Sequence, residues 1–427
     1  MFSFKKVMGN MDVKKDLLLL LTIGGLYSLS IALSNTFVNV YLWKQSGEFF
    51  DLGLYNLSVV IMQPITFILA GRLAKKIDRV IVLRLGVSSL AIFFITVLFI
   101  GENASHYLIL LGGVLGVGYG FYWLAFNVLT FEITEPDTRD FFNGFLGILS
   151  SFAGMIGPIL AGFIISSMKQ FTGYTVIFAI SLGLFSGAVI LSFFLKRRPA
   201  KGQFHLRRII QERKNNYNWK MVTNAHFFQG LREGTFAFMI TVMVFITTGS
   251  EMALGKFGLV NSGVSFVAYY VASRVIKKHF RIKSILYGGI VIYASIFLLL
   301  FDITYTRLII YAVVIAIGYP FLLIPYVSLT YDVIGKAWNA AEMRIEYIVV
   351  REVFLNMGRI TSIILFLIAV SFFNEKVSIP ILLAIIGAGH SVIYFFIRKI
   401  KIDSEDPIKS KALSKRKLIE GEGGSTA

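Results

Sequence analysis

Residues 70–86, AGRLAKKIDRVIVLRLG, have a second copy later in the chain at 272–288, ASRVIKKHFRIKSILYG. Each copy starts in one apolar run, passes through a cluster of basic residues and enters the next apolar run. The copies align without a gap, and the identical pairs are Ala70/Ala272, Arg72/Arg274, Lys75/Lys277, Lys76/Lys278, Arg79/Arg281 and Gly86/Gly288. The chain therefore contains an internal duplication, and a basic loop is part of the repeated unit.

A second set of matches lies at nearly the same offset. Residues 118–121, GYGF, correspond to 318–321, GYPF, and residues 129–132, LTFE, correspond to 329–332, LTYD. Because an even number of apolar runs separates the copies, both copies cross a membrane in the same direction. Such repeats form parallel halves related by an axis along the membrane normal.

The composition shows that lipid is the main solvent of this chain. Of its 427 residues, 56% are hydrophobic and 15% are charged, and the mean hydropathy is +0.73. A membrane-spanning helix needs roughly 20 mostly apolar residues, and the sequence predicts an all-α protein with twelve of them. The expected spans are 17–43, 51–74, 80–100, 106–131, 141–168, 173–195, 221–248, 252–275, 284–301, 306–331, 345–373 and 377–398.

The distribution of charge predicts the orientation in the membrane. The net charge is +18, and the basic residues gather in the loops 72–79, 196–220 and 277–283, whereas the alternate loops are nearly free of them. Basic loops stay on the cytoplasmic side, so we expect a multi-pass protein of the cell membrane with both termini in the cytoplasm. This placement argues against nucleic-acid binding, and the absence of cysteine excludes disulfides and thiolate metal sites.

The duplication also predicts the domain organisation. We expect a first six-helix bundle over 1–198, a cytoplasmic basic linker over 199–220, a second six-helix bundle over 221–400 and a disordered cytoplasmic tail over 401–427. The stretch 196–220 mixes apolar side chains with its charges, so it is either a plain linker or a helix that lies at the level of the lipid headgroups.

Two parallel six-helix halves with a basic loop after the second span of each half resemble the major facilitator superfamily. The loop signature of that family reads Gly-x-Leu-Ala-Asp-Arg-x-Gly-Arg, and Gly71, Leu73, Ala74 and Arg79 match it, whereas Lys75 replaces the acid and Asp78 a glycine. The resemblance implies the family fold, alternating access, and a latch that closes the cytoplasmic side. Its residues here would be Gly71, Arg72, Lys75, Asp78 and Arg79, with Arg274 and Arg281 in the second copy.

The fifth span is similar to a signature of exporters in the same family, which has glycines around a Gly-Pro pair. The matching positions are Gly144, Ala153, Gly157, Pro158, Ala161 and Gly162. Small side chains let two helix backbones approach closely, which suits a hinge or a sliding face. The resemblance also implies a charged turn after span four, formed by Glu132 and Arg139, with Asp332 and Arg344 in the second half.

Charged side chains near the middle of two spans mark the candidate site. Span seven carries Gln229, Arg232 and Glu233, and span eleven carries Glu346, Arg351, Glu352, Asn356 and Arg359. Each such charge costs at least about 2.5–3.5 kcal/mol in lipid, so it must face water or a partner. One hypothesis is a polar site for an anionic or zwitterionic group, with Glu233 or Glu352 carrying a proton. The alternative is an ion-pair network that only stabilises the second half.

The first half offers uncharged groups to the same cavity. Asn35, Asn39 and Asn127 can donate and accept hydrogen bonds, and the fourth span adds aromatic surface. An aromatic wall facing a charged wall would suit an amphipathic cargo. His390 in the last span is a single histidine for which we expect no acidic neighbour, and we expect it to be packed rather than functional.

These features together predict a secondary active transporter that works by alternating access and exports an amphipathic small molecule. One alternative is a lipid or glycolipid flippase, and another is a transport-inactive sensor or scaffold. No phosphate-binding loop, metal-ligand cluster or nucleophile elbow is present in the sequence, so we expect neither an enzyme nor a bound cofactor or metal. We expect a monomer, coupled to either a proton or a sodium gradient.

Overall fold

The computed structural model describes residues 15–400 apart from 134–135, 170, 201 and 301, and these residues form helices without a sheet. The long helices of the first half are α2 (Lys15–Ser46), α3 (Phe49–Lys76), α4 (Arg79–Ile100), α5 (Leu108–Ile133), α6 (Pro136–Ser167) and α7 (Thr172–Phe193). Those of the second half are α9 (Tyr217–Thr248), α10 (Glu251–Val275), α11 (Arg281–Ile296), α12 (Tyr305–Gly335), α13 (Arg344–Phe372), and the pair α14 (Glu375–Gly387) and α15 (Gly389–Ile397).

The all-α fold with twelve spans is confirmed. Within the described residues, eleven helical segments are long and apolar enough to cross a membrane, with α14 and α15 forming one of them. The twelfth is α10, which has 25 residues and is less apolar because it carries polar groups such as Lys256 and Asn261. Short 3-10 turns, η1 (Gly101–His106), η2 (Lys278–Phe280) and η3 (Phe297–Leu299), complete the connections.

Polar side chains fix where several helices begin. The Asp78 carboxylate accepts from the amide of Val80 at 2.7 Å at the start of α4, and the side chain of Asn216 accepts from the amide of Trp219 at the start of α9. Gly249, at a φ of 62°, ends α9, and the next residue, Ser250, caps α10. Side-chain caps satisfy amides that have no partner within the helix, so α9 and α10 can be joined by a very short turn.

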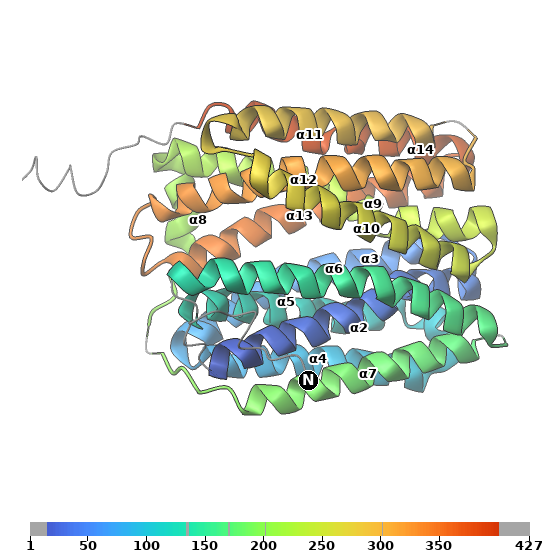
Figure 1. The fold of residues 1–427 in the computed structure, drawn as a ribbon, viewed down its shortest axis with the longest axis horizontal. Helices are drawn as coiled ribbons and strands as arrows, with labels where there is room; N and C mark the ends of the chain where they lie inside the picture. Colours follow the sequence, from blue (N-terminus) through green and yellow to red (C-terminus); the bar gives the residue numbers. More distant parts are fainter. Residues whose placement is uncertain (1–14, 134–135, 170, 201, 301, 401–427) are drawn as a thin grey trace, which may run out of the picture.

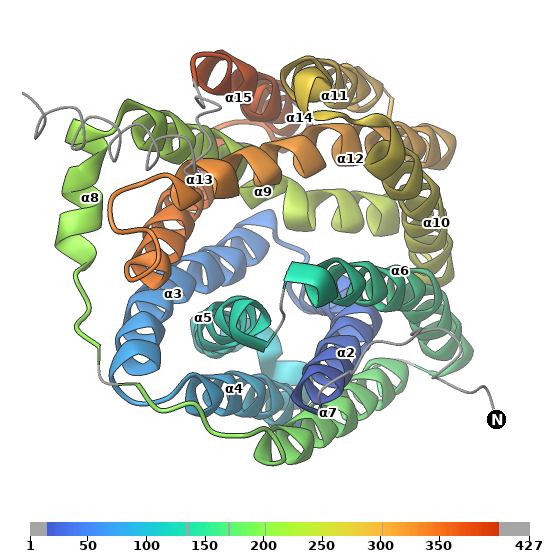
Figure 2. The same cartoon turned by 60° about the vertical axis from the view of Figure 1, so that its left-hand side comes forward.

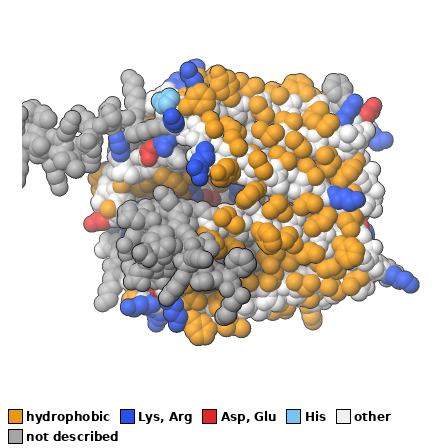
Figure 3. All heavy atoms as spheres, in the orientation of Figure 1, with side chains coloured by type: hydrophobic (Ala, Val, Ile, Leu, Met, Phe, Trp, Pro, Cys, Tyr) orange, Lys and Arg blue, Asp and Glu red, His pale blue; other side chains and the backbone are white. Residues whose placement is uncertain are grey.

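The helices form two bundles that lie side by side (Figure 1). Helices α2–α7 make one bundle and α9–α15 make the other, and Figure 2 shows both from one end. Charged side chains gather at the two ends of the molecule, and a broad hydrophobic belt lies between them (Figure 3). We call the end that carries α8 (Leu206–Asn215) the linker end, and the opposite end the far end.

Helix α8 packs on protein with its apolar side. Ile209 is fully buried with Trp219 of α9 and Tyr347 of α13, and the indole of Trp219 donates to the carbonyl of Ile209 at 3.2 Å. Before α8, the chain runs antiparallel to the loop between α3 and α4, where the amide of Ala200 donates to the carbonyl of Ile77. The segment between the halves therefore contains a helix, and its buried side faces the protein rather than lipid.

Helices α9 and α13 approach one another most closely where glycines face a backbone. A Cβ atom at Gly230 would overlap the carbonyl oxygen of Leu355, and one at Gly358 would overlap the carbonyl oxygen of Phe227. Small residues permit such contact between helices in lipid. The contact aligns the middle of α9 with the middle of α13, and these are the segments that carry the intramembrane charges.

Replacing Gly230 with alanine should lower stability, because the added methyl group has no room against the backbone of α13. Overpacking costs about 1–3 kcal/mol, and we expect a drop in the thermal unfolding temperature in detergent. Gly183→Ala in α7 is the control, since a Cβ there meets no atom within 4 Å. Equal unfolding temperatures for the two variants would contradict the close contact.

Candidate functional site

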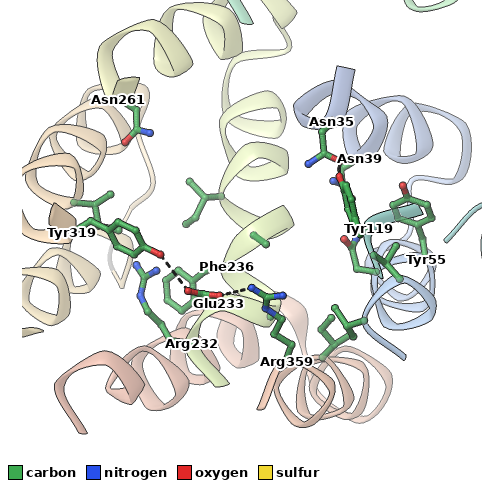
Figure 4. A pocket seen from close by; sticks show the side chains of 18 of the residues that line it. Asn35, Asn39, Tyr55, Tyr119, Arg232, Glu233, Phe236, Asn261, Tyr319 and Arg359 are labelled. Carbon is green, nitrogen blue, oxygen red and sulfur yellow. Dashed lines mark hydrogen bonds and ion pairs between the residues drawn. The ribbon is translucent and has the colours of Figure 1, made fainter. Parts of the chain in front are cut away.

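A cavity of about 470 Å³ lies between the two halves near mid-depth. Both bundles contribute to its lining, which includes three charged side chains, all from the second half (Figure 4). The polar lining residues are Asn35, Asn39, Tyr55, Asn56, Gln63, Tyr119, Arg232, Glu233, Asn261, Ser265, Tyr311, Tyr319 and Arg359. The apolar ones include Val59, Leu115, Phe236, Ile240, Phe257, Ile315 and Ile363.

Glu233 is the centre of a hydrogen-bonded network. Its Oε2 pairs with Nη2 of Arg359 at 2.7 Å, and its Oε1 accepts from Gln229 at 2.8 Å and from the hydroxyl of Tyr319 at 3.2 Å. Residues 229 and 233 are one turn apart on α9, Tyr319 comes from α12, and Arg359 comes from α13. The carboxylate is thus held by three helices of the second half.

Arg232 is partnered differently, although it is the next residue of α9. It is 6% exposed. Its Nη2 donates to the hydroxyl of Tyr311 at 3.3 Å, and its guanidinium lies 4.5 Å from the centre of the Phe236 ring. Its Nε has no hydrogen-bond partner among the described residues. The guanidinium is therefore buried against an aromatic ring and a hydroxyl.

The wall from the first half is made largely of amides. The hydroxyl of Tyr119 donates to Oδ1 of Asn35 at 3.1 Å, and the amide nitrogen of Asn56 donates to Oδ1 of Asn39 at 2.8 Å. The aromatic side chains of Tyr122, Trp123 and Phe126 do not line the cavity, because they stack against Tyr27 and one another. Of the aromatic surface expected from the fourth span, Tyr119 lines the cavity, Tyr122 and Phe126 are core packing, and Trp123 is exposed.

Five of the candidate residues lie outside the lining. Gln229 touches the site through Glu233, while Arg351 and Glu352 form their own pair at 2.6 Å. Asn356 connects the Arg351–Glu352 pair to Arg359 of the cavity, since it donates to the carbonyl of Glu352 and accepts from Arg359 at 3.5 Å. Asn127 is half-buried on α5 away from the cavity. Asn35, Asn39, Arg232, Glu233 and Arg359 are the candidates that the cavity brings together.

The expectation that His390 has no acidic neighbour is wrong. Its Nε2 lies 4.0 Å from Oε1 of Glu233, and its ring packs near Tyr319. Sequence analysis also missed Tyr311, Tyr319, Asn56 and Asn261. The internal repeat could have identified Tyr319, because this residue corresponds to Tyr119 and both tyrosines line the cavity.

A buried ion pair joins the halves at the linker end. Nζ of Lys75 in α3 lies 2.5 Å from Oε1 of Glu346 in α13, and it also donates to the carbonyl of Glu342 at 2.8 Å. The amide of His205 donates to the same carboxylate oxygen at 3.2 Å. We call Lys75 and Glu346 the linker-end clasp. Lys75, at the position where the family signature has an acid, thus makes a charge contact between the two halves.

Asp78 is not part of the linker-end clasp and makes other contacts. Besides capping α4, its carboxylate pairs with Arg197 at 3.1 Å and accepts from the amide of Arg198. Both partners belong to the chain that leaves the first half. Asp78 therefore fixes the start of the segment between the halves.

The repeated loops make the same ion pair in both halves. Arg79 pairs with Glu132 at 2.9 Å, and the corresponding Arg281 pairs with Asp332 at 2.8 Å. The side chain of Arg139, the predicted partner of Glu132, lies outside the described residues. Arg72 and Arg274 are exposed. Gly71 faces Phe204 of the segment between the halves and Val349 of α13.

The far end has a charge contact that sequence analysis did not predict. Nζ of Lys44 in α2 lies 2.8 Å from Oε1 of Glu251 in α10, and the hydroxyl of Tyr174 donates to the same oxygen at 2.9 Å. The Lys44 ammonium also lies within 6 Å of the ring centres of Phe171, Tyr174 and Phe245. We call Lys44 and Glu251 the far-end clasp. It joins the two halves opposite the linker-end clasp.

The small residues of α6 lie at the contact with α10 and α2. Pro158 faces Gly255 and Gly258 of α10, and Gly162 faces the backbone of Glu251. Gly157 packs on Ala32 of α2. The surroundings of Gly144 lie outside the described residues. The Gly-Pro pair thus lies where the two halves touch along their sides.

The comparison with known families agrees with this architecture. The sequence profile of the Major Facilitator Superfamily matches residues 20–343. The chain belongs to the Major Facilitator Superfamily. Membership makes it a multi-pass membrane protein and a secondary transporter rather than an enzyme.

Relatives and solved structures extend this result. The chain is 66% identical over 406 residues to "Uncharacterized protein YqgE" of Bacillus subtilis (strain 168), covering 95% of this chain and 94% of the relative. It is 62% identical over 206 residues to "Uncharacterized protein in sodM 3'region" of Geobacillus stearothermophilus, covering 48% of this chain and 96% of that one.

Two crystal structures show the superfamily fold with little sequence similarity. The human organic anion transporter MFSD10 (TETRAN) superposes with a TM-score of 0.66 at 11% identity, and a mutant of the nucleoside transporter NupG with a TM-score of 0.68 at 13% identity. In both cases the match covers 91% of this chain and 100% of the other.

Removing one member of the Glu233–Arg359 pair should destabilise the second half more than removing both. Arg359→Gln leaves a partly buried carboxylate without its cation, which costs up to about 3–5 kcal/mol, the range for a fully buried pair. In Arg359→Gln/Glu233→Gln that carboxylate is gone, so part of the stability should return. Thermal unfolding of the two single variants and the double variant measures the coupling. Additive losses would show that the pair does not interact.

Lys75→Met should also destabilise the protein, because Glu346 is fully buried and would lose its cation. We expect a loss of about 3 kcal/mol or more, partly recovered in the exchanged variant Lys75→Glu/Glu346→Lys. Unfolding in detergent measures this, with Lys76→Met as the control because Lys76 is exposed. If both methionine variants unfold at the same temperature, the linker-end clasp contributes no stability.

Proposed function

We propose that this transporter exports an amphipathic small molecule by alternating access, and that the cavity between the halves binds it. Support comes from where the polar groups lie. The cavity gathers Arg232, Glu233 and Arg359 near mid-depth, with amides opposite and apolar surface between. A concave, mostly apolar site with a few convergent polar groups is the usual form of a small-molecule site.

The size of the cavity favours a small molecule over a lipid with two acyl chains. Its volume of about 470 Å³ lies in the lower part of the roughly 300–1,000 Å³ range of small-molecule pockets. Its lining also alternates between polar and apolar groups. A flippase is therefore the second candidate rather than the first.

Alternating access needs two gates that open in turn, and the two clasps are suitable gates. Each joins a lysine of the first half to a glutamate of the second. The proposed moving bodies are the bundles over 1–198 and 221–400, with the linker end facing the cytoplasm of the cell. Export as the direction is supported by Gly157, Pro158 and Gly162, which match the exporter pattern.

Glu233 is the proposed coupling carboxylate. Of the two acids considered, it lines the cavity, whereas Glu352 pairs with Arg351 outside the lining. A cation that binds Glu233 would weaken its pair with Arg359 and so would change the charge of the site. Dissipating either a proton or a sodium gradient across vesicles identifies the coupling ion.

Everted membrane vesicles test the export proposal. Energised vesicles should accumulate a radiolabelled amphipathic probe, either phenylbutyrate or phenylbutylamine, above the level of vesicles from cells that lack the protein. Ala237→Trp should abolish this accumulation, because Ala237 lines the cavity. Ala294→Trp is the control, since Ala294 is exposed on α11 and outside the cavity lining.

Glu352→Gln provides a second control on the position of the site. We expect this variant to lower the unfolding temperature, because Arg351 loses its partner. Accumulation of the probe per amount of folded protein should equal that of the wild type.

A dithionite-protection assay with fluorescent phosphatidylglycerol in proteoliposomes tests the flippase alternative. Movement of that lipid without accumulation of either probe would replace the export proposal.

A further inference from the structure

Arg232 is a cation of the cavity lining that forms no ion pair with a carboxylate of the described residues. No Asp or Glu oxygen of the described residues lies within 4.0 Å of its guanidinium nitrogens. Its observed contacts are the Tyr311 hydroxyl and the face of Phe236. A buried charge is costly unless it is paired, so this guanidinium provides a site for a negative group that enters the cavity.

The cavity lining as a whole carries a net positive charge, as Arg232 does. Its charged side chains are Arg232, Arg359 and Glu233, which together give one net positive charge. Glu233 is already paired with Arg359 at 2.7 Å and holds two further donors. A ligand with a single negative charge would make the occupied cavity neutral.

The amides on the opposite wall are oriented as donors. The Oδ1 atoms of Asn35 and Asn39 already accept from Tyr119 and Asn56. The side-chain hydrogen bonds of these two residues use Oδ1 and leave the NH₂ groups without an acceptor among the described residues, and Figure 4 shows both side chains facing the cavity across from Arg232. Donors on both walls select a ligand that is rich in acceptor oxygens.

We propose that the cargo is an organic anion, with an apolar body and a carboxylate or sulfonate that binds Arg232. The apolar body would lie against Phe236, Ile240 and Phe257, and its other oxygens would accept from Asn35 and Asn39. This assignment rests on the proposed function, since it names the substrate class of the same cavity. Arginine suits such a role because its planar donors match the oxygens of a carboxylate.

Three probes with one apolar body and different charges test the assignment. They are phenylbutyrate, phenylbutanamide and phenylbutylamine, added to the purified protein in neutral detergent. A ligand that binds the folded state raises the unfolding temperature with its concentration. We expect phenylbutyrate to raise it and the uncharged and cationic probes to leave it unchanged.

Variants separate the role of Arg232 from its effect on folding. Arg232→Gln should weaken phenylbutyrate binding by about 10- to 100-fold, the range expected for hydrogen bonds to a charged group. Arg232→Lys should retain the preference for the anion, and Glu233→Gln should bind it more tightly. Arg84→Gln is the matched control, because Arg84 also lies over a phenylalanine ring, at 4.7 Å, and donates to backbone carbonyls of α7.

Each outcome supports or overturns the assignment. A wild-type protein that is stabilised by the amine or the amide, or by none of the three, overturns it, as does an Arg232→Gln variant with unchanged affinity for phenylbutyrate. The experiments also distinguish a failure of the export proposal from a failure of the organic-anion assignment. Accumulation of phenylbutylamine in everted vesicles would keep export and reject the anion, whereas Arg232-dependent binding without accumulation would keep the anion and reject export.

Discussion

The cost of placing a charge in lipid governs how this chain is built. A charged side chain within the membrane must find a partner or water, and most of those described here find a partner from another helix. Lys75 meets Glu346, Lys44 meets Glu251, and Glu233 meets Arg359. The first two pairs join the halves at opposite ends, and the third lies in the cavity between them. Electrostatics thus determines where the halves touch at each end and which helices hold the charges of the cavity.

Sequence alone predicted the fold well, because lipid requires long apolar helices and the repeat fixes their pairing. The expected span 80–100 is helix Arg79–Ile100, and the expected span 252–275 is helix Glu251–Val275. The repeat also indicates equivalent ion pairs in the two halves. Arg79 and Arg281 occupy matching positions, and each pairs with an acid at the end of the fourth span of its half. These features depend on periodicity and on contacts that are local within a half.

The site was only partly predictable, because its members come from helices that are far apart in the chain. Arg232, Glu233 and Arg359 were identified as intramembrane charges, but nothing in the sequence indicated that Glu352 pairs away from the cavity. His390 lies 157 positions beyond Glu233, and its proximity follows from how α15 packs on α9. Glycines decide which faces of two helices can meet. Gly389, for example, lies close to the backbone of Phe228 in α9. Such contacts are visible only in three dimensions.

The two clasps have a further consequence for the membrane itself. A passage that opened at both ends would let ions leak and would discharge the gradient that drives a secondary transporter. Both clasps close through the same pair of bodies, with the lysine always on the first half and the glutamate on the second. If each half moves as a rigid unit, separating them at one end presses them together at the other. On the proposed mechanism, the two stiff bundles act as a lever that closes one end while the other opens, and this limits leakage.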